Sequence, residues 1–245
     1  MKLALALVLT AITAFAEEEK DEAPRVFALI PIQLTAGEKT TLRLRGLKLK
    51  DATEVRVAPE AQATLKDKKD VGVPTGLEAK DVGDHEVAIE LTPPAGCEKV
   101  TVEIVTPSGV TKAREVSVFP KDALVTEKEP NNGFREAQPI EAGKPLCGKI
   151  DADKDVDVFR FDAHAGEALT VRVIAADAGS LLDPILSLFD SAGHLLATED
   201  DTHGHRDPVL MFMPKTDGPL CLVVNDAHDR GGPWHEYRLE ISRQP

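Results

Sequence analysis

Short segments in which apolar and polar residues alternate recur along most of this chain. In the first half, glycines and prolines, which favour turns, separate these segments. Alternation with many β-branched residues is typical of strands that bury one face. The strands predicted in this half cover residues 40–44, 54–57, 86–91, 100–105 and 115–118. Their number and spacing predict a small β-sandwich over residues 26–119.

The same pattern continues further along the chain and predicts a second β-rich domain over residues 129–245. The predicted strands cover residues 146–150, 157–161, 168–174, 184–189, 195–198, 209–212, 220–224 and 236–241. Eight short strands are typical of a jelly roll or a related sandwich. No segment shows sustained helical periodicity. We therefore predict an all-β chain of two β-sandwich domains, joined by a linker at residues 120–128.

The first residues have the features of an export signal. Lys2 precedes an apolar run, and Ala14-Phe15-Ala16 forms a small-x-small cleavage site. We expect residues 1–16 to be a signal peptide and the charged residues 17–25 to be a disordered spacer. No later stretch approaches about 18 uninterrupted apolar residues, the length of a membrane span. The sequence thus predicts a secreted or periplasmic protein without membrane insertion.

The formal net charge of the chain is −13. Binding to nucleic acid or to an anionic membrane surface needs a basic patch, which a chain of this composition lacks. We therefore expect no nucleic-acid partner. The sign of the charge suits a cation, although acidic residues also serve solubility.

Residues 127–132 place four oxygen-bearing side chains just before the second domain. These are Glu127, Glu129, Asn131 and Asn132. Alternate residues of an extended chain point the same way, so the two glutamates can present their carboxylates together. Ca²⁺ prefers six to eight oxygen ligands of this kind. We predict a calcium site here, against the alternative of an acidic linker with an asparagine-rich turn.

Three short motifs follow one another in the first domain. They are Ala36-Gly37-Glu38, Leu44-Arg45-Gly46-Leu47-Lys48-Leu49 and Thr106-Pro107-Ser108-Gly109. With these motifs, residues 26–119 resemble immunoglobulin-like modules of the IPT/TIG kind. Such modules are usually spacers or binding platforms. The resemblance therefore implies an immunoglobulin-like sandwich and no catalytic residue.

A longer series of landmarks occurs in the second domain. They are Glu129-Pro130-Asn131-Asn132, Gly148-Lys149-Ile150, residues 155–161, Gly166, Leu182-Asp183-Pro184, residues 188–193, Asp200-Asp201 and Tyr237-Arg238-Leu239. Together they make residues 126–242 similar to the bacterial pre-peptidase C-terminal domain. This family includes the collagen-binding modules of bacterial collagenases. The resemblance implies a β-sandwich, usually appended to secreted proteases, whose linker carboxylates and amides bind calcium.

The resemblance also implies particular calcium ligands. By position, the linker ligands are Glu127, Glu129, Asn131 and Asn132. Asparagine at position 132 stands where an aspartate is common, which removes one ligand charge. The remaining ligands are implied to come from Asp153, Asp155 or Asp157, and the sequence leaves these three open.

Aromatic residues make up only 4% of the chain, and Trp234 and Tyr237 are the candidates for a ligand-contacting surface. In the collagenase relatives, tyrosines on the later strands touch collagen. Here those strands carry a single tyrosine, so collagen is not the expected partner. The three cysteines leave at least one thiol without a partner in the chain, and a bridge between Cys147 and Cys221 is left open.

The usual catalytic motifs, among them Gly-x-Ser-x-Gly and His-Glu-x-x-His, do not occur in the sequence. We therefore expect an exported, non-catalytic binding or accessory protein. Its calcium-stiffened C-terminal sandwich would engage an extracytoplasmic protein or polysaccharide. One alternative is a structural spacer or envelope scaffold without a specific ligand. Another is a metal-dependent hydrolase that uses the loop with His203 and His205.

Overall fold

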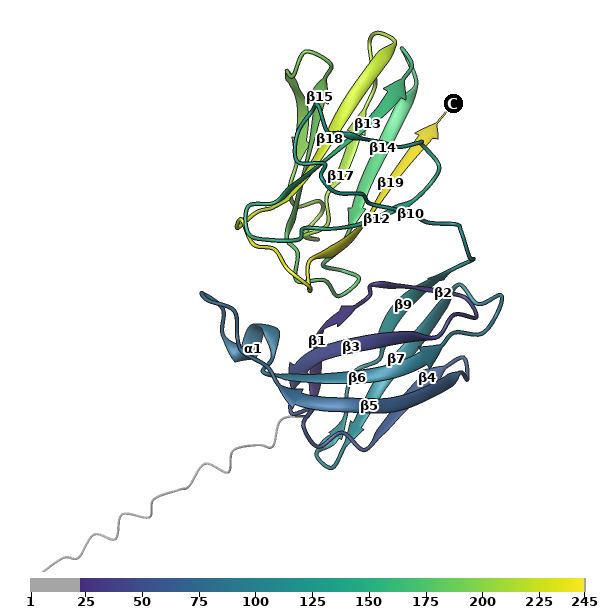
Figure 1. Ribbon diagram of the computed structural model, residues 1–245, viewed down its shortest axis with the longest axis vertical. Helices are drawn as coiled ribbons and strands as arrows, with labels where there is room; N and C mark the ends of the chain where they lie inside the picture. Colours follow the sequence, from purple (N-terminus) through teal and green to yellow (C-terminus); the bar gives the residue numbers. More distant parts are fainter. Residues whose placement is uncertain (1–22, 245) are drawn as a thin grey trace, which may run out of the picture.

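The computed structural model describes residues 23–244, which form two β-sandwiches placed end to end (Figure 1). The all-β prediction is confirmed, because strands dominate and the single helix of the described part, α1 (Ala79–Val82), has only four residues. No helix within residues 23–244 has the length and apolar character to cross a membrane. The predicted signal peptide, residues 1–16, and residues 17–22 of the predicted spacer lie outside the described residues.

Two sheets pack face to face in the first sandwich. Its strands are β1 (Arg25–Ile30), β2 (Gln33–Thr35), β3 (Thr40–Leu47), β4 (Glu54–Ala58), β5 (Gln62–Asp70), β6 (His85–Thr92), β7 (Lys99–Thr106), β8 (Gly109–Val110) and β9 (Arg114–Phe119). One sheet has the order β1-β3-β6-β5, and the other has the order β2-β9-β7-β4 with β8 paired to β7. Alternation fixes the inner face: Val100, Val102 and Ile104 of β7 are completely buried.

The second sandwich is built in the same way from two five-stranded sheets. Its strands are β10 (Val125–Thr126), β11 (Gln138–Pro139), β12 (Leu146–Lys149), β13 (Val156–Ala163), β14 (Ala168–Ile174), β15 (Pro184–Asp190), β16 (Leu195–Glu199), β17 (Val209–Phe212), β18 (Gly218–Asp226) and β19 (Glu236–Gln244). The sheet orders are β10-β12-β19-β14-β17 and β11-β13-β18-β15-β16. Phe159 and Tyr237 are fully buried between the sheets, with ring centroids 6.5 Å apart.

The second sandwich begins earlier than the sequence predicted. Val125 and Thr126, inside the predicted linker, pair in parallel with Leu146 and Cys147 of β12. The N–H of Glu127 then donates to the carbonyl of Cys147 at 2.9 Å. A strand edge offers unpaired N–H and C=O groups, and this segment satisfies them. Residues 125–132, called the lead-in segment below, therefore belong to the second sandwich. Only residues 120–124 connect the domains.

The two sandwiches also touch directly. The N–H of Ile32 donates to Oε2 of Glu236 at 3.1 Å. Beside this bond, Trp234 packs with Ala28 and Ile30 in a small apolar cluster. The start of β19 is therefore held against the first sandwich by both a hydrogen bond and apolar contact.

Candidate metal centre

The lead-in segment holds Glu127 in a fixed position. Its backbone is paired with β12, as described above, and Oε2 of its carboxylate accepts a hydrogen bond from the N–H of Lys149 at 2.7 Å. A carboxylate tied to a backbone N–H has little rotational freedom left. The other carboxylate oxygen, Oε1, is thereby directed toward the start of β13.

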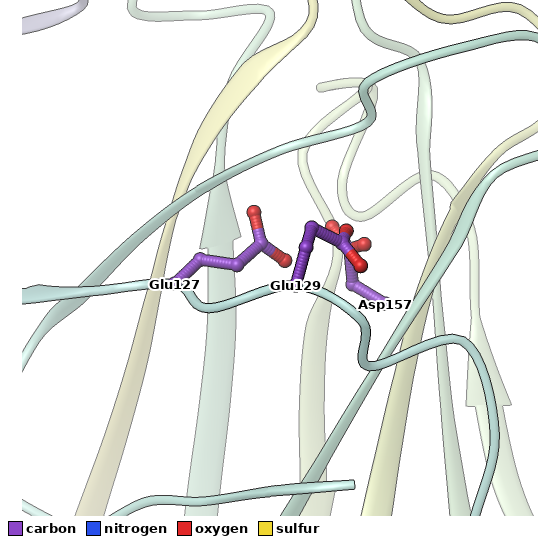
Figure 2. A group of neighbouring side chains, drawn as sticks. All are labelled: Glu127, Glu129 and Asp157. Atoms are coloured by element: carbon purple, nitrogen blue, oxygen red, sulfur yellow. The ribbon is translucent and has the colours of Figure 1, made fainter. Parts of the chain in front are cut away.

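Glu127, Glu129 and Asp157 form a cluster of three carboxylates. One oxygen from each lies within 4.8 Å of the other two. Figure 2 shows the two glutamates reaching from the lead-in segment and Asp157 reaching from the strand beside it. Asp157 lies in β13 and is completely buried, whereas Glu129 is exposed. Two segments about 30 residues apart in the chain thus bring like charges together, an arrangement that is unfavourable unless a proton or a cation compensates it.

Asn131 orients both glutamates. Its side-chain Nδ2 donates to Oε1 of Glu127 at 2.7 Å, and its backbone N–H donates to Oε2 of Glu129 at 3.0 Å. Its carbonyl accepts a hydrogen bond from the N–H of Val158 at 3.0 Å, which ties the lead-in segment to β13. Asn131 is fully buried, so these bonds are shielded from water.

Tyr237 supports the cluster from below. Its hydroxyl lies 2.6 Å from Oδ2 of Asp157 and 3.3 Å from Oε1 of Glu127. Room for the ring depends on Gly148 of β12, because a Cβ at that position would collide with the phenol oxygen and ring carbons. β12 and β19 pair at this point, Gly148 opposite Tyr237. Gly148 therefore leaves the space in which the ring of Tyr237 lies next to the carboxylates.

The surroundings raise the pKa values of Asp157 and Glu129. For Asp157, burial is the largest cause, the charge of Glu127 adds to it, and the pKa rises to about 9. For Glu129, which is exposed, partial desolvation is the largest cause; the hydrogen bond from the N–H of Asn131 opposes it, and the neighbouring carboxylates add to it. Without a cation, Asp157 therefore holds a proton at neutral pH.

The donor set fits a hard cation. All three clustered side chains offer carboxylate oxygens, the ligands that Ca²⁺ prefers. Oδ1 of Asp157 and Oδ1 of Asn131 are buried and have no hydrogen-bond partner among the described residues. Buried oxygens without a donor are costly, and a bound cation would satisfy them. The neighbouring Lys149 does not neutralise the cluster, because its ammonium pairs with Asp151 at 2.5 Å.

Three of the predicted ligands lie outside the cluster. Asn132 donates from Nδ2 to Oδ1 of Asp155 at 2.7 Å, and Oδ2 of Asp155 accepts from the N–H of Asp151 at 2.7 Å. Oδ1 of Asp153 accepts from the N–H of Gly231 at 3.2 Å. These side chains stabilise the turn before β13. Of the three aspartates that the sequence left open, the structure brings Asp157 to the glutamates.

Neither of the predicted ligand-contacting aromatics, Trp234 and Tyr237, presents an open ring to solvent. Tyr237 is 0% exposed and Trp234 is 7% exposed. Tyr237 points into the sandwich because its position on β19 faces the core. Trp234 is covered by the first sandwich, a contact that no local pattern in the sequence reveals. Its remaining exposure borders a cavity that is described below.

The structure does not assemble the alternative metal site at the histidine loop. His205 has Nδ1 2.9 Å from Oδ2 of Asp177, an exposed pair. Among residues 23–244, the glutamate–aspartate cluster is the one group of three or more side chains close enough to hold a metal ion, and it includes neither His203 nor His205. The hydrolase alternative thus has no third ligand in the described part of the chain.

Cys147 and Cys221 are both free. Cys147 lies in β12 and Cys221 in β18, which belong to different sheets. On β18, Leu220 and Leu222 join the core between the sheets, whereas Cys221 packs with Val158 on the opposite face. Cys221 therefore points away from the sheet that carries Cys147, and no bridge forms.

No family model matches this chain, and no curated protein matches it. Solved structures do show a likeness. The pre-peptidase C-terminal domain of collagenase from Bacillus anthracis is 15% identical and covers 47% of this chain and 100% of its own, with a TM-score of 0.35. PliG of Aeromonas hydrophila, a periplasmic inhibitor of g-type lysozyme, is 18% identical and covers 49% of this chain and 97% of its own, also with a TM-score of 0.35.

A third similar structure is SGBP-B of Bacteroides ovatus, in complex with a mixed-linkage heptasaccharide. It is 12% identical and covers 91% of this chain and 74% of its own, with a TM-score of 0.28. At these identities and TM-scores, the functions of the three proteins are not transferred to this chain. The resemblance of residues 26–119 to IPT/TIG modules stays a prediction.

Proposed function

We propose that this chain is an exported binding or accessory protein whose second sandwich is stiffened by a calcium ion. The ion would be held by Glu127, Glu129 and Asp157, with Asn131 beside them. The observation that carries the proposal is the gathering of these three carboxylates within 4.8 Å of one another. No catalytic step is part of the proposal.

The expected role of the ion is to join the lead-in segment to β13. Glu127 and Glu129 belong to the first and Asp157 to the second, so an ion bound by all three links them. An ion that binds only the folded arrangement stabilises it by mass action, by about 2.7 kcal/mol at a concentration 100 times the Kd. The displaced proton of Asp157 leaves as the ion binds.

Calorimetric titration of chelator-treated protein with Ca²⁺, and separately with Mg²⁺, tests this function. We expect saturable binding of one Ca²⁺ and weaker binding of Mg²⁺, which demands a stricter octahedral geometry. Glu129→Gln should abolish or strongly weaken calcium binding. Glu115→Gln is the matched control, because this exposed glutamate pairs with Lys99 on the first sandwich, in a separate domain. Calcium binding that survives Glu129→Gln unchanged would refute the site.

The direct contact between the sandwiches supports a second role, as a spacer that holds two modules at a fixed angle. The hydrogen bond from Ile32 to Glu236 and the packing of Trp234 on Ala28 support this second role. Small-angle scattering tests it. A scattering profile that fits one rigid, elongated particle and does not change with salt supports a spacer. A profile that requires many relative orientations of the two domains contradicts it. The export signal and the extracytoplasmic partner remain part of the proposal and rest on the sequence.

A further inference from the structure

A cavity of about 270 Å³ lies between the two sandwiches, apart from the carboxylate cluster. The segment that leads into α1 contributes one side, including Leu77. Figure 1 shows this segment rising from the first sandwich toward the second. The other side comes from the second sandwich, chiefly residues 230–235. Ligand sites occur preferentially at such domain boundaries.

One wall of the cavity is apolar and fixed in place. It includes Trp234 and Leu181. The guanidinium of Arg43 lies over the indole ring, 4.9 Å from its centroid. The backbone of Trp234 is held as well, because its carbonyl accepts from the N–H of Leu181 at 2.8 Å and from the hydroxyl of Ser180 at 3.0 Å. A ligand would meet this ring already oriented, so little conformational entropy is lost on binding.

Arg230 and His235 add polar side chains to the lining of the cavity. No carboxylate of the described residues lies within ion-pair distance of the Arg230 guanidinium; its backbone N–H, rather than its side chain, bonds to Asp226. His235 is 8% exposed, and its Nδ1 is buried without a hydrogen-bond partner in the described part of the chain. Burial lowers the pKa of His235, so the ring is neutral at pH 7 and can donate or accept.

From this combination we propose that the cavity binds one carboxylated sugar ring, a uronate. An indole wall suits the apolar face of a sugar ring. The unpaired guanidinium of Arg230 suits a carboxylate, which it can bind in a bidentate manner. His235 and the nearby carboxylate of Asp153 suit hydroxyl groups. The inference rests on the proposed role as a binding protein, and it names the class of partner.

The size of the cavity limits the ligand to one ring. Its volume of about 270 Å³ is slightly below the roughly 300 Å³ at which sites for drug-sized ligands begin. A free uronic acid and the terminal residue of an acidic glycan share the required chemistry. A sugar ring in the middle of a glycan would need the cavity to be open on both sides.

The single tryptophan of the chain makes the test specific. Intrinsic fluorescence reports on Trp234 alone, so galacturonate and glucuronate can be titrated while the cavity wall itself is observed. Galactose and glucose serve as the uncharged counterparts. We expect a saturable fluorescence change with at least one uronate and at least tenfold weaker binding of the matching neutral sugar. Calorimetry should give the same Kd.

Two variants separate a site from general charge attraction. Arg230→Gln should weaken uronate binding at least tenfold. Arg172→Gln removes the same charge from an exposed position on β14 and should leave binding unchanged. Circular dichroism confirms that both variants fold. Trigalacturonate then distinguishes the two sources of the ligand. If it binds as tightly as galacturonate, the cavity takes the terminal residue of a glycan. If it does not bind, the cavity takes the free uronic acid.

Three results would overturn the inference. The first is that neither galacturonate nor glucuronate shows saturable binding at tens of millimolar. The second is that the matching neutral sugar binds as tightly as the uronate. The third is that Arg230→Gln and Arg172→Gln weaken uronate binding equally. Each titration is repeated with and without Ca²⁺. Failure at the cavity leaves calcium binding by Glu129 intact, and failure of calcium binding leaves the fluorescence titration interpretable, so the two proposals fail separately.

Discussion

The hydroxyl of Tyr237 donates a 2.6 Å hydrogen bond to Oδ2 of Asp157, linking the two sheets of the second sandwich in its interior. Both residues are 0% exposed. The bond gives a buried carboxyl one of the few donors within its reach. It also places an aromatic side chain directly beneath the candidate metal centre.

Replacing Tyr237 by phenylalanine should destabilise the protein. The change removes the donor to Asp157 and leaves a buried acceptor without a partner, which typically costs about 1–3 kcal/mol. Urea unfolding of chelator-treated protein measures the difference. Saturating Ca²⁺ should reduce the loss, because the ion compensates the same carboxyl. An equal loss with and without Ca²⁺ would show that the hydroxyl does not act through the site.

Without calcium, the free energy of unfolding should fall as the pH rises from about 4 to about 9. Burial and the charge of Glu127 raise the pKa of Asp157 from 3.8 to about 9, so the folded state keeps a proton that the unfolded chain releases. This stabilisation is fully present below the unfolded pKa and is lost as the pH passes through the folded pKa. Urea unfolding across this range gives the slope. Asp157→Asn should flatten it, and a slope unchanged by that substitution would assign it to other groups.

Calcium binding at pH 7 should release about one proton, because metal ligands must be deprotonated and Asp157 holds a proton in the free site. Calorimetry in buffers of different ionisation enthalpy measures this number from the change in apparent binding enthalpy. At pH 10 the release should vanish, since Asp157 is then already ionised. Calcium binding without proton release at pH 7 would contradict the raised pKa.

Gly148→Ala should displace Tyr237 and weaken the site. A Cβ at this position meets the phenol ring directly, and forcing extra volume into a packed interior costs about 1–3 kcal/mol. Thermal unfolding and calcium titration measure the two effects. Gly72→Ala is the matched control, because a Cβ there has nothing within 4 Å. Wild-type behaviour of Gly148→Ala would mean that the ring relocates without cost.

Much of the fold could be predicted because alternation is a local signal. The predicted strands at 168–174 and 209–212 coincide with β14 and β17. β5 was missed, although it spans nine residues. It lies at the edge of its sheet and is mostly charged, so its sequence carries little of the apolar signal that marks a strand. Backbone pairing with β6 holds it in place instead.

The candidate site could be predicted only in part. Asp153, Asp155 and Asp157 are spaced two residues apart, so alternation along a strand would place all three on the same face. The pattern therefore cannot say which of them is the ligand. What separates them is where the strand begins. β13 starts at Val156, so Asp157 points inward from a strand while the other two lie in the preceding turn. Strand ends are set by tertiary pairing and are the least visible feature of a sequence.

Neighbouring positions on β19 serve different domains: Glu236 accepts the N–H of Ile32 in the first sandwich, and Tyr237 reaches the carboxylates inside the second. Successive residues of a strand point to opposite faces, so adding or deleting one residue between Tyr237 and Leu239 would exchange the faces of Glu236 and Tyr237 relative to the rest of β19. Both the domain contact and the floor of the metal centre would be lost together. Homologous chains that keep both features should therefore keep Glu236 and Tyr237 and not vary in length between Glu236 and Leu239.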